Sequence, residues 1–434
     1  MKEMDIKIFF KIAKQSYKIV DAEDLYLATR NVFYNLARLV AETSLLSIWR
    51  KFNVTKYFLR RAAFRSRLMR FLELPSKSRI IDRIGARLDV MRVNKAIASG
   101  RYKYVHLLYH DKFSVPFVEF LNRNFPTDEH LVLCRRISSY PFPHGENVLE
   151  IRRFKGLDLK SEKIEKIICH SLFDTKLVDF LYINKALLKK AYWAVWGGDL
   201  YNAPRDAKND FVRQNFKGYI AGVDREYVIA KYGMSGMFYD VYLYHPIPAE
   251  KLDAARRNVV PHSGVRVQIN NSSDESTLEI METLSRFADR DLTVTTVLSY
   301  GQLQWKDEII KRGTLLFGQR FEFIDRYMSQ EEYAQYMASN DILVLNQPRQ
   351  QAVGNTAAML YMGKKVFIRE EVSTYKGFVA AGMSIHSTQT IGSLSFDEFI
   401  EYNEKSRTGT SAIAASAFFD EESCSKSFRE FLIH

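Results

Sequence analysis

The segment from Tyr192 to Tyr201 places a carboxylate directly after an apolar strand. It reads Y-W-A-V-W-G-G-D-L-Y, a run of aromatic and β-branched residues that ends in Gly197, Gly198 and Asp199. Glycines allow a sharp turn or a close approach to a ligand, and open α/β sheets bind ligands beyond the carboxyl ends of their strands. We therefore predict Asp199 as a general base or acceptor-positioning group, with an ordinary turn as the alternative.

Other polar side chains follow predicted strands in the first half of the chain. His110 and Asp111 come directly after one strand, and His170 comes after another. In a parallel sheet these loops share one edge with Asp199, where an imidazole or a carboxylate could deprotonate a sugar hydroxyl. His170 is the second catalytic candidate, with a loop histidine satisfied by backbone hydrogen bonds as the alternative. Asp224, in A-G-V-D-R-E, is expected to cap a helix.

Small polar residues follow the first predicted strand of the second half. The strand 265–269 ends in N-N-S-S-D, and a helix is expected from about Glu275. Backbone N–H groups at the amino end of a helix favour phosphate. Capping of the helix by Ser273 or Asp274 explains the same composition. The candidate phosphate-binding residues are Asn271, Ser272 and Ser273.

A second phosphate-binding loop is predicted within Leu345–Arg369. This segment reads L-N-Q-P-R-Q-Q-A-V-G-N-T-A-A-M-L-Y-M-G-K-K-V-F-I-R. An arginine in the loop and a helix that opens with Gly and Thr are typical of a diphosphate site. Tyr300, which follows the predicted strand 292–298, borders the same cleft and could stack on a sugar or base. The candidates in the loop are Arg349, Gln350, Gln351, Gly354, Asn355 and Thr356.

The elements that must position these residues alternate between short strands and helices. This alternation begins near Tyr102 and is typical of a doubly wound parallel sheet. A Pro-containing linker interrupts it, and a second series starts at Val265. We predict an α/β protein with two tandem Rossmann-like domains that face a shared cleft. The predicted domains are a helical extension at 1–100, an acceptor domain at 101–262, and a nucleotide domain at 263–434 with closing helices at 395–404 and 415–432.

Composition limits the class of protein. The 434 residues are 47% hydrophobic, which supports a buried core. No run reaches the length of a membrane span, and the charged start does not resemble a signal peptide, so we expect a cytoplasmic, peripheral protein. The three cysteines have no paired or metal-ligand spacing, so neither a metal nor a cofactor is expected.

The net charge of +12 is concentrated in one segment. Residues 51–100 hold thirteen Lys and Arg residues against three acidic ones, and residues 1–100 show helical apolar spacing. A basic amphipathic helix can lie on an anionic membrane. It can equally pack on a neighbouring domain or form a homo-oligomer. Binding of a nucleic acid by this segment is the alternative function for the whole chain.

From about Tyr102 to Thr390 the chain resembles the bacterial TDP-N-acetylfucosamine:lipid II N-acetylfucosaminyltransferases, glycosyltransferase family 56. The matching stretches are W-A-V-W-G-G-D-L-Y at 193–201, Q-I-N-N-S-S-D at 268–274, F-E-F-I-D-R-Y at 321–327, Y-A-Q-Y-M-A-S-N-D-I at 333–342 and R-Q-Q-A-V-G-N-T at 349–356. The resemblance implies a two-domain GT-B fold. It also implies a sugar-nucleotide donor in the second half and a polyprenyl-diphosphate-linked acceptor in the first.

The resemblance also assigns roles to individual positions. Asp199 and its glycines match the family's W-G-A-D loop, and His170 matches a histidine after a strand. The loop from Arg349 to Thr356 matches the family's R-Q-Q-x-x-G-x-x loop. The chain departs from the family's G-N-S-G-D, which appears here as 270–274 without a glycine.

The sequence thus predicts a metal-independent hexosyltransferase. The expected partners are a dTDP- or UDP-linked sugar, a lipid-linked or other glycan acceptor and an anionic membrane surface at the inner face of the cell membrane. No nucleic-acid partner is expected on this interpretation. The nucleotide sugar enters as a substrate and not as a cofactor.

Overall fold

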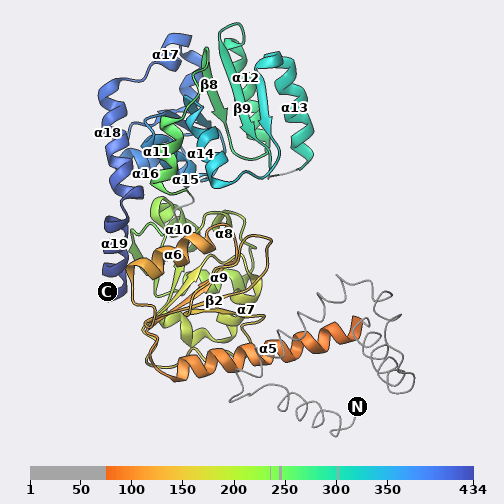
Figure 1. The fold of residues 1–434 in the computed structure, drawn as a ribbon, viewed down its shortest axis with the longest axis vertical. Helices are drawn as coiled ribbons and strands as arrows, with labels where there is room; N and C mark the ends of the chain where they lie inside the picture. Colours follow the sequence, from red (N-terminus) through yellow and green to blue (C-terminus); the bar gives the residue numbers. More distant parts are fainter. Residues whose placement is uncertain (1–74, 235, 244–246, 300, 302) are drawn as a thin grey trace, which may run out of the picture. The chain divides into compact units, whose positions relative to one another are not determined.

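The computed structural model describes residues 75–434 except 235, 244–246, 300 and 302 (Figure 1). The chain divides into two compact units, Met1–Ile81 and Asp82–His434. Both sheets lie in the second unit. Most of the predicted extension, residues 1–74, lies outside the described residues. No helix in the described part of the chain is long and apolar enough to cross a membrane.

The first sheet has seven parallel strands in the order β3-β2-β1-β4-β5-β6-β7. Its central strands are buried on both faces, as expected of a parallel sheet covered by helices on each side. The strands are β1 (Tyr104–Leu108), β2 (His130–Cys134), β3 (Val148–Glu150), β4 (Lys166–His170), β5 (Ala191–Ala194), β6 (Gly218–Ile220) and β7 (Met237–Tyr239).

Helices cover both faces of this sheet. One core contains Val105 and Leu107 of β1 and is covered by α5 (Pro75–Ala98), α7 (Thr175–Ile183), α9 (Ala207–Gln214) and α10 (Arg225–Tyr232). The other core contains Tyr104 and Leu108 and is covered by α6 (Ser114–Asn124) and α19 (Glu421–Ile433). The alternation along β1 is the period of two expected for a strand.

The second sheet has six parallel strands in the order β10-β9-β8-β11-β12-β13. These are β8 (Val265–Ile269), β9 (Leu292–Val297), β10 (Phe321–Ile324), β11 (Ile342–Leu345), β12 (Lys365–Ile368) and β13 (His386–Ser387). One core is covered by α11 (Ala249–Arg257), α14 (Gln330–Ala338), α15 (Val353–Tyr361), α16 (Ser373–Ala380) and α18 (Glu404–Ala414). The other core is covered by α12 (Glu275–Leu284), α13 (Leu303–Phe317) and α17 (Phe396–Ile400).

Each sheet contains one topological switch point. In the first sheet the chain moves outward from β1 through β2 to β3, and β4 starts again on the other side of β1. In the second sheet β8 leads to β9 and β10, and β11 starts on the other side of β8. Ligands of doubly wound sheets bind in the crevice beyond the carboxyl ends of such strand pairs. The predicted fold class, two Rossmann-like doubly wound domains, is confirmed.

Three predicted boundaries differ from the structure. The linker contains α11, whose Leu252 and Ala255 are buried in the core of the second sheet. The carboxyl-terminal part of α5 belongs to the first sheet, because Val93 and Ile97 lie in its core. The last helix, α19, also returns to the first sheet, where Phe428 packs beside Phe125 of that lobe. The boundary 263–434 therefore assigns α19 to the wrong sheet.

We call residues 82–243 with α19 the first lobe and residues 247–419 the second lobe. This division follows the buried cores of the two sheets. In Figure 1 the blue carboxyl-terminal chain runs from α18 to α19, which lies beside the strands and helices of the first lobe. The predicted helix 415–432 is interrupted at Asp420, which caps α19 through a hydrogen bond from the backbone N–H of Glu422.

Candidate active site

One cavity of about 1020 Å³ is lined by loops from both lobes. From the first lobe it receives the loops after β1, β5 and β6. From the second lobe it receives the loops after β8, β9 and β11. The cavity therefore lies beyond both switch points. Six of the predicted donor-site residues line it: Asn271, Arg349, Gln350, Gln351, Gly354 and Asn355.

Asn270 fixes the loop after β8. Its backbone is left-handed, with a φ of 42°, a conformation that asparagine tolerates better than most residues. The buried side chain accepts a hydrogen bond from the backbone N–H of Asn346 at 2.7 Å and donates to Thr277 Oγ1 at 2.9 Å. These bonds hold the ends of β8 and β11 and the start of α12 together. The residues that follow are thereby directed toward the cavity.

Gln351 joins the two loops that the sequence predicted for phosphate. Its Nε2 donates to Asn271 Oδ1 at 3.0 Å and to Ser272 Oγ at 2.7 Å. Ser273 is buried behind them, and a Cβ at Gly301 would lie 2.5 Å from its backbone nitrogen. The segment 270–274 contains no glycine. The close backbone approach at Ser273 is instead made possible by Gly301 of the neighbouring loop.

The loop before α15 presents one cation and one helix amino end to the cavity. Arg349 is half-buried, and its guanidinium donates to the carbonyl of Gln350 at 3.2 Å. Ala352, with a φ of 59°, starts α15, so Gly354 and Asn355 line the cavity from the first turn. A helix amino end carries partial positive charge from its unpaired N–H groups. The guanidinium of Arg349 and the amino end of α15 together suit a diphosphate.

Three donor-site candidates among the described residues, Ser272, Ser273 and Thr356, do not line the cavity. Thr356 is fully buried, and its hydroxyl has no hydrogen-bond partner among the described residues. It therefore belongs to the packed side of α15. Tyr300 lies outside the described residues. Asn355 donates from its side-chain amide to the hydroxyl of Tyr333, which also lines the cavity.

Asp199 is a buried structural carboxylate. It accepts hydrogen bonds from the backbone N–H groups of Leu172 at 2.8 Å and Trp196 at 2.9 Å, and from Trp193 Nε1 at 2.7 Å. Burial raises its pKa, and these three donors partly oppose that rise. The side chain is 2% exposed and does not line the cavity. The three hydrogen bonds are all made to groups of the first lobe, so the geometry gives Asp199 a structural role and does not support its prediction as a base.

The glycines before Asp199 are required by contacts across the cavity. Gly197 has a φ of 80° and a ψ of −64°, and a side chain there would collide with the side-chain amide of Gln350. Gly198 lines the cavity beside Phe173. The glycine segment therefore does allow a close approach, and the group that approaches it is Gln350 of the second lobe.

His170 lies in a chain of buried imidazoles. Its Nε2 is 2.9 Å from His106 Nδ1, and His106 Nε2 is 3.0 Å from His130 Nδ1. Burial lowers the pKa of His170 and that of His130 to about 3, so both rings are neutral at physiological pH. Each neutral ring donates one hydrogen bond and accepts one. His170 is fully buried and does not line the cavity, so this geometry does not support its prediction as a base either.

Asp111 is the carboxylate that the first switch point presents to the cavity. It follows β1, is half-buried and lines the cavity. Its Oδ1 accepts a hydrogen bond from the backbone N–H of Phe113 at 2.6 Å, and the described residues supply no donor for Oδ2. Burial raises its pKa to about 6. The sequence placed Asp111 at the correct edge but gave no signal to prefer it over Asp199.

Asp224 connects the two lobes. It stands before α10, but its side chain makes no capping hydrogen bond, which corrects the prediction of a helix cap. It accepts instead from Tyr201 at 2.8 Å and from Ser373 of the second lobe at 2.5 Å. Burial raises its pKa to about 6. Because Tyr201 is the last residue of α8 (Gly198–Tyr201), this contact couples the Asp199 loop to α16.

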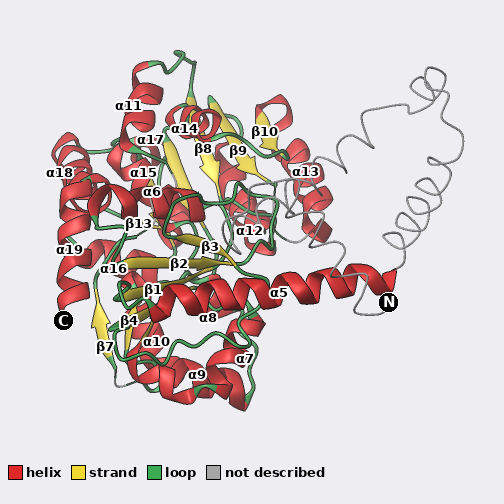
Figure 2. Ribbon diagram, turned by 60° about the horizontal axis from the view of Figure 1, so that its bottom comes forward, coloured by secondary structure: helices red, strands yellow, loops and turns green. Residues whose placement is uncertain are grey.

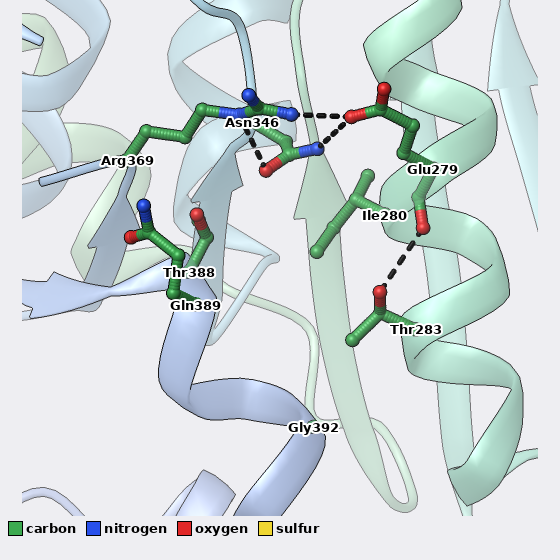
Figure 3. Close-up of a pocket in the computed structure, with 8 residues that line it drawn as sticks. All are labelled: Glu279, Ile280, Thr283, Asn346, Arg369, Thr388, Gln389 and Gly392. Atoms are coloured by element: carbon green, nitrogen blue, oxygen red, sulfur yellow. Dashed lines mark hydrogen bonds and ion pairs between the residues drawn. The ribbon is translucent and has the colours of Figure 1, made fainter. Parts of the chain in front are cut away.

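A smaller cavity of about 350 Å³ lies at the carboxyl ends of β11 and β12, beside α12 (Figure 3). Arg369 donates to Asn346 Oδ1 at 3.1 Å and pairs with Glu279, and Asn346 Nδ2 donates to the same carboxylate at 3.1 Å. The charges lining it thus neutralise one another. We assign it to holding α12 against the strand ends and not to binding a ligand.

Solved structures with a similar fold include three that bear on the architecture. A UDP-forming α,α-trehalose-phosphate synthase from Burkholderia vietnamiensis has a TM-score of 0.54 at 8% identity, over 76% of this chain and 96% of that one. A glycosyltransferase from Rickettsia africae has a TM-score of 0.53 at 9% identity, over 76% and 98%. A sucrose-phosphate synthase from Thermosynechococcus elongatus has 0.51 at 10%, over 76% and 98%.

These likenesses show the fold alone, which is the GT-B arrangement of two Rossmann-like domains. No protein-family model and no curated protein matches the sequence. Membership of the fucosaminyltransferase family therefore stays a prediction. Within the described residues no group of three or more His, Cys, Asp or Glu side chains is placed to hold a metal ion.

We expect Asp199→Asn to destabilise the protein. The asparagine replaces one acceptor oxygen by an NH₂ group, which then faces an N–H donor, and this costs about 1 to 3 kcal/mol of the free energy of unfolding. Urea unfolding followed by tryptophan fluorescence measures the change. Asp179→Asn, at an exposed residue paired with Lys208 at 2.6 Å, is the matched control and should cost less than about 1 kcal/mol. Equal effects of the two variants would contradict the structural role of Asp199.

Proposed function

We propose that the protein is a glycosyltransferase that moves a hexose from a nucleotide diphosphate onto an acceptor hydroxyl. The observation that carries this proposal is the single cavity lined by the switch-point loops of both sheets. Each crevice of this kind suits one ligand. A donor and an acceptor held side by side in one cavity is the arrangement that a transfer reaction needs.

The donor diphosphate binds at the second lobe on this proposal. Arg349 supplies charge-assisted hydrogen bonds, and the first turn of α15 supplies backbone N–H groups. Asn271, oriented by Gln351, lies beside them. Negative charge grows on the diphosphate as the bond to the sugar breaks, so these groups stabilise the transition state more than the bound donor.

The acceptor binds at the first lobe, with Asp111 as the general base. The acceptor oxygen forms the new bond to the anomeric carbon while the bond from that carbon to the diphosphate oxygen breaks. The bonding pair leaves with the diphosphate, and the hydroxyl proton passes to the Asp111 carboxylate. The open Oδ2 and the raised pKa support this assignment. Asp111 thus takes the role predicted for Asp199 and His170.

The finer identity of the substrates rests on the resemblance to the fucosaminyltransferases. We propose a dTDP- or UDP-linked deoxyamino or related hexose as donor. The acceptor is a polyprenyl-diphosphate-linked or other cell-envelope saccharide. The aromatic side chains of Phe113, Phe173 and Trp196, which line the first-lobe side of the cavity, offer stacking surfaces for a sugar ring.

Replacement of Arg349 by alanine should weaken nucleotide binding. Loss of a charge-assisted hydrogen bond to the diphosphate costs about 1.5 to 3 kcal/mol, so the affinity falls roughly tenfold to more than a hundredfold. We expect UDP or dTDP to raise the melting temperature of the wild type and to raise it much less for Arg349→Ala. Arg326→Ala, at an exposed arginine of the same lobe that pairs with Glu332, is the control. Equal shifts in both variants, or none in the wild type, would contradict the donor site.

The rate of transfer should rise with pH through about 6 and level off above it. The base acts in its deprotonated form, which is present above the pKa of Asp111, and this pKa is raised to about 6. Asp111→Asn should remove this dependence and lower the rate by about 10² to 10⁴, with nucleotide binding retained. The readout is release of nucleoside diphosphate from the sugar nucleotide that stabilises the wild type.

Asp224→Asn is the comparison for this experiment, because burial raises the pKa of Asp224 to the same value of about 6. Our assignment would be wrong if Asp224→Asn lost the pH dependence while Asp111→Asn kept it. That result would identify Asp224 as the base.

A further inference from the structure

Helix α5 is attached to the first lobe by one face only. Val93 and Ile97 of this face are buried in the lobe's core. Asp89, 2% exposed, accepts hydrogen bonds from the backbone N–H of Arg152 at 3.2 Å and from its guanidinium at 2.7 Å. Asn94 Oδ1 accepts from the backbone N–H of Asp158 at 2.9 Å. These contacts fix which face of residues 82–98 points outward.

The outward face carries a stripe of large apolar side chains. Ile84, Leu88 and Met91 are 54%, 41% and 67% exposed. At about 100° per residue they fall within an arc of about 60°, opposite the buried face. Single exposed apolar residues are ordinary on a protein surface, but a stripe at i, i+4 and i+7 is the pattern of a helix face that meets an apolar partner.

Cationic side chains flank this stripe. Arg83 and Arg87 are exposed on one flank and Arg92 is half-buried on the other, while the exposed Lys95 continues the line of the stripe one turn beyond Met91. The only acidic residues of 82–98 are Asp82 and Asp89, and Asp89 is turned into the lobe. Figure 2 shows this part of α5 as a continuous helix beside the first lobe. An apolar centre with basic flanks is the pattern of a helix that lies in the interface of an anionic membrane.

We propose that the outer face of α5, residues 84–95, docks the protein on an anionic lipid bilayer. Ile84, Leu88 and Met91 enter the boundary between head groups and acyl chains, and Arg87 and Lys95 contact the anionic head groups. This inference is independent of the proposed function. It identifies the residues through which the membrane partner expected from the basic segment is bound.

Charge argues against the stretch before α5, a second copy of α5 and nucleic acid as occupants of this face. Residues 51–74, the stretch before α5, contain seven Lys and Arg residues and one acidic residue. Folding them over the stripe would place cations against cations. A second copy of α5 would do the same. Nucleic acid matches the basic flanks but would set phosphates against the apolar centre. An anionic bilayer offers acyl chains to the apolar side chains and anionic head groups to the basic ones.

A fluorophore on the stripe tests the proposal in the full chain. The native cysteines Cys134, Cys169 and Cys424 are all buried, so Leu88→Cys can be labelled selectively with an environment-sensitive dye. We expect a blue shift of its emission with phosphatidylglycerol vesicles and none with phosphatidylcholine vesicles. Ile183→Cys, at a position that is 79% exposed on α7, is the control and should not respond.

Two sets of substitutions measure the contribution of each group to vesicle co-sedimentation. Ile84→Ser with Leu88→Ser and Met91→Ser should lower the partition coefficient about tenfold or more. Arg87→Gln with Lys95→Gln should lower it about tenfold to thirtyfold. The matched control is Ile183→Ser with Val260→Ser and Leu315→Ser, which removes three comparably exposed apolar side chains elsewhere and should leave binding unchanged.

Several outcomes would overturn the proposal. A dye at 88 that is already blue-shifted in the free protein and insensitive to vesicles would show that the chain itself covers the stripe. A dimer that the triple serine variant dissociates, without a change in vesicle binding, would assign the face to a second copy. A dye response to duplex DNA and none to lipid would assign it to nucleic acid. Equal vesicle binding by the stripe and control variants would also end the proposal.

Discussion

Parallel pairing is the constraint on which the arrangement of the site depends. All strands of a parallel sheet point their carboxyl ends to one edge, and a crevice opens where two neighbouring strands continue in opposite directions. Here this happens once between β1 and β4 and once between β8 and β11. The loop after β1 brings Asp111, and the loops after β8 and β11 bring Asn271 and Arg349. Residues separated by some 240 positions in sequence thus line one cavity because of strand order.

The contacts between the lobes include buried polar groups beside apolar ones such as Val223 on the second-lobe core and Tyr242 against Phe418. Asp224 of the first lobe accepts a hydrogen bond from Ser373 of the second, and Tyr201 bonds the same carboxylate oxygen. Gln350 reaches the loop at Gly197. Polar contacts of this kind can be exchanged for water at modest cost. The covalent return of the chain through α19 anchors the second lobe to the apolar core of the first.

Sequence reasoning found the elements because their signals are local. The predicted strands 265–269 and 292–298 agree with β8 and β9 to within one residue, because strands of buried parallel sheets are continuous apolar runs. Local signals could not show which lobe α19 packs against. Its apolar stripe fits the core of either lobe, and only the path of the chain through Asp420 decides between them.

The same limit explains why the sequence placed loop residues of the second lobe at the cavity but did not single out the carboxylate that lines it from the first lobe. Arg349 and Gln351 carry groups that the backbone of a short connection cannot use, so their presence indicated a ligand. Asp199 and Asp111 are both carboxylates after strands, and the sequence does not show which N–H groups surround each one. Trp193, six residues before Asp199, supplies one of the decisive donors.

Hydrogen-bond satisfaction is the physical criterion that separates structural from reactive polar groups here. Asp199 has three donors, and His170 is joined to His106 within a closed apolar environment. Both groups are committed to hydrogen bonds within the first lobe and neither lines the cavity. Asp111 lines the cavity with only one of its oxygens hydrogen-bonded among the described residues, and burial has already raised its pKa toward neutrality. A group in that state can accept a proton and release it again with little reorganisation of the fold, which is what a general base must do.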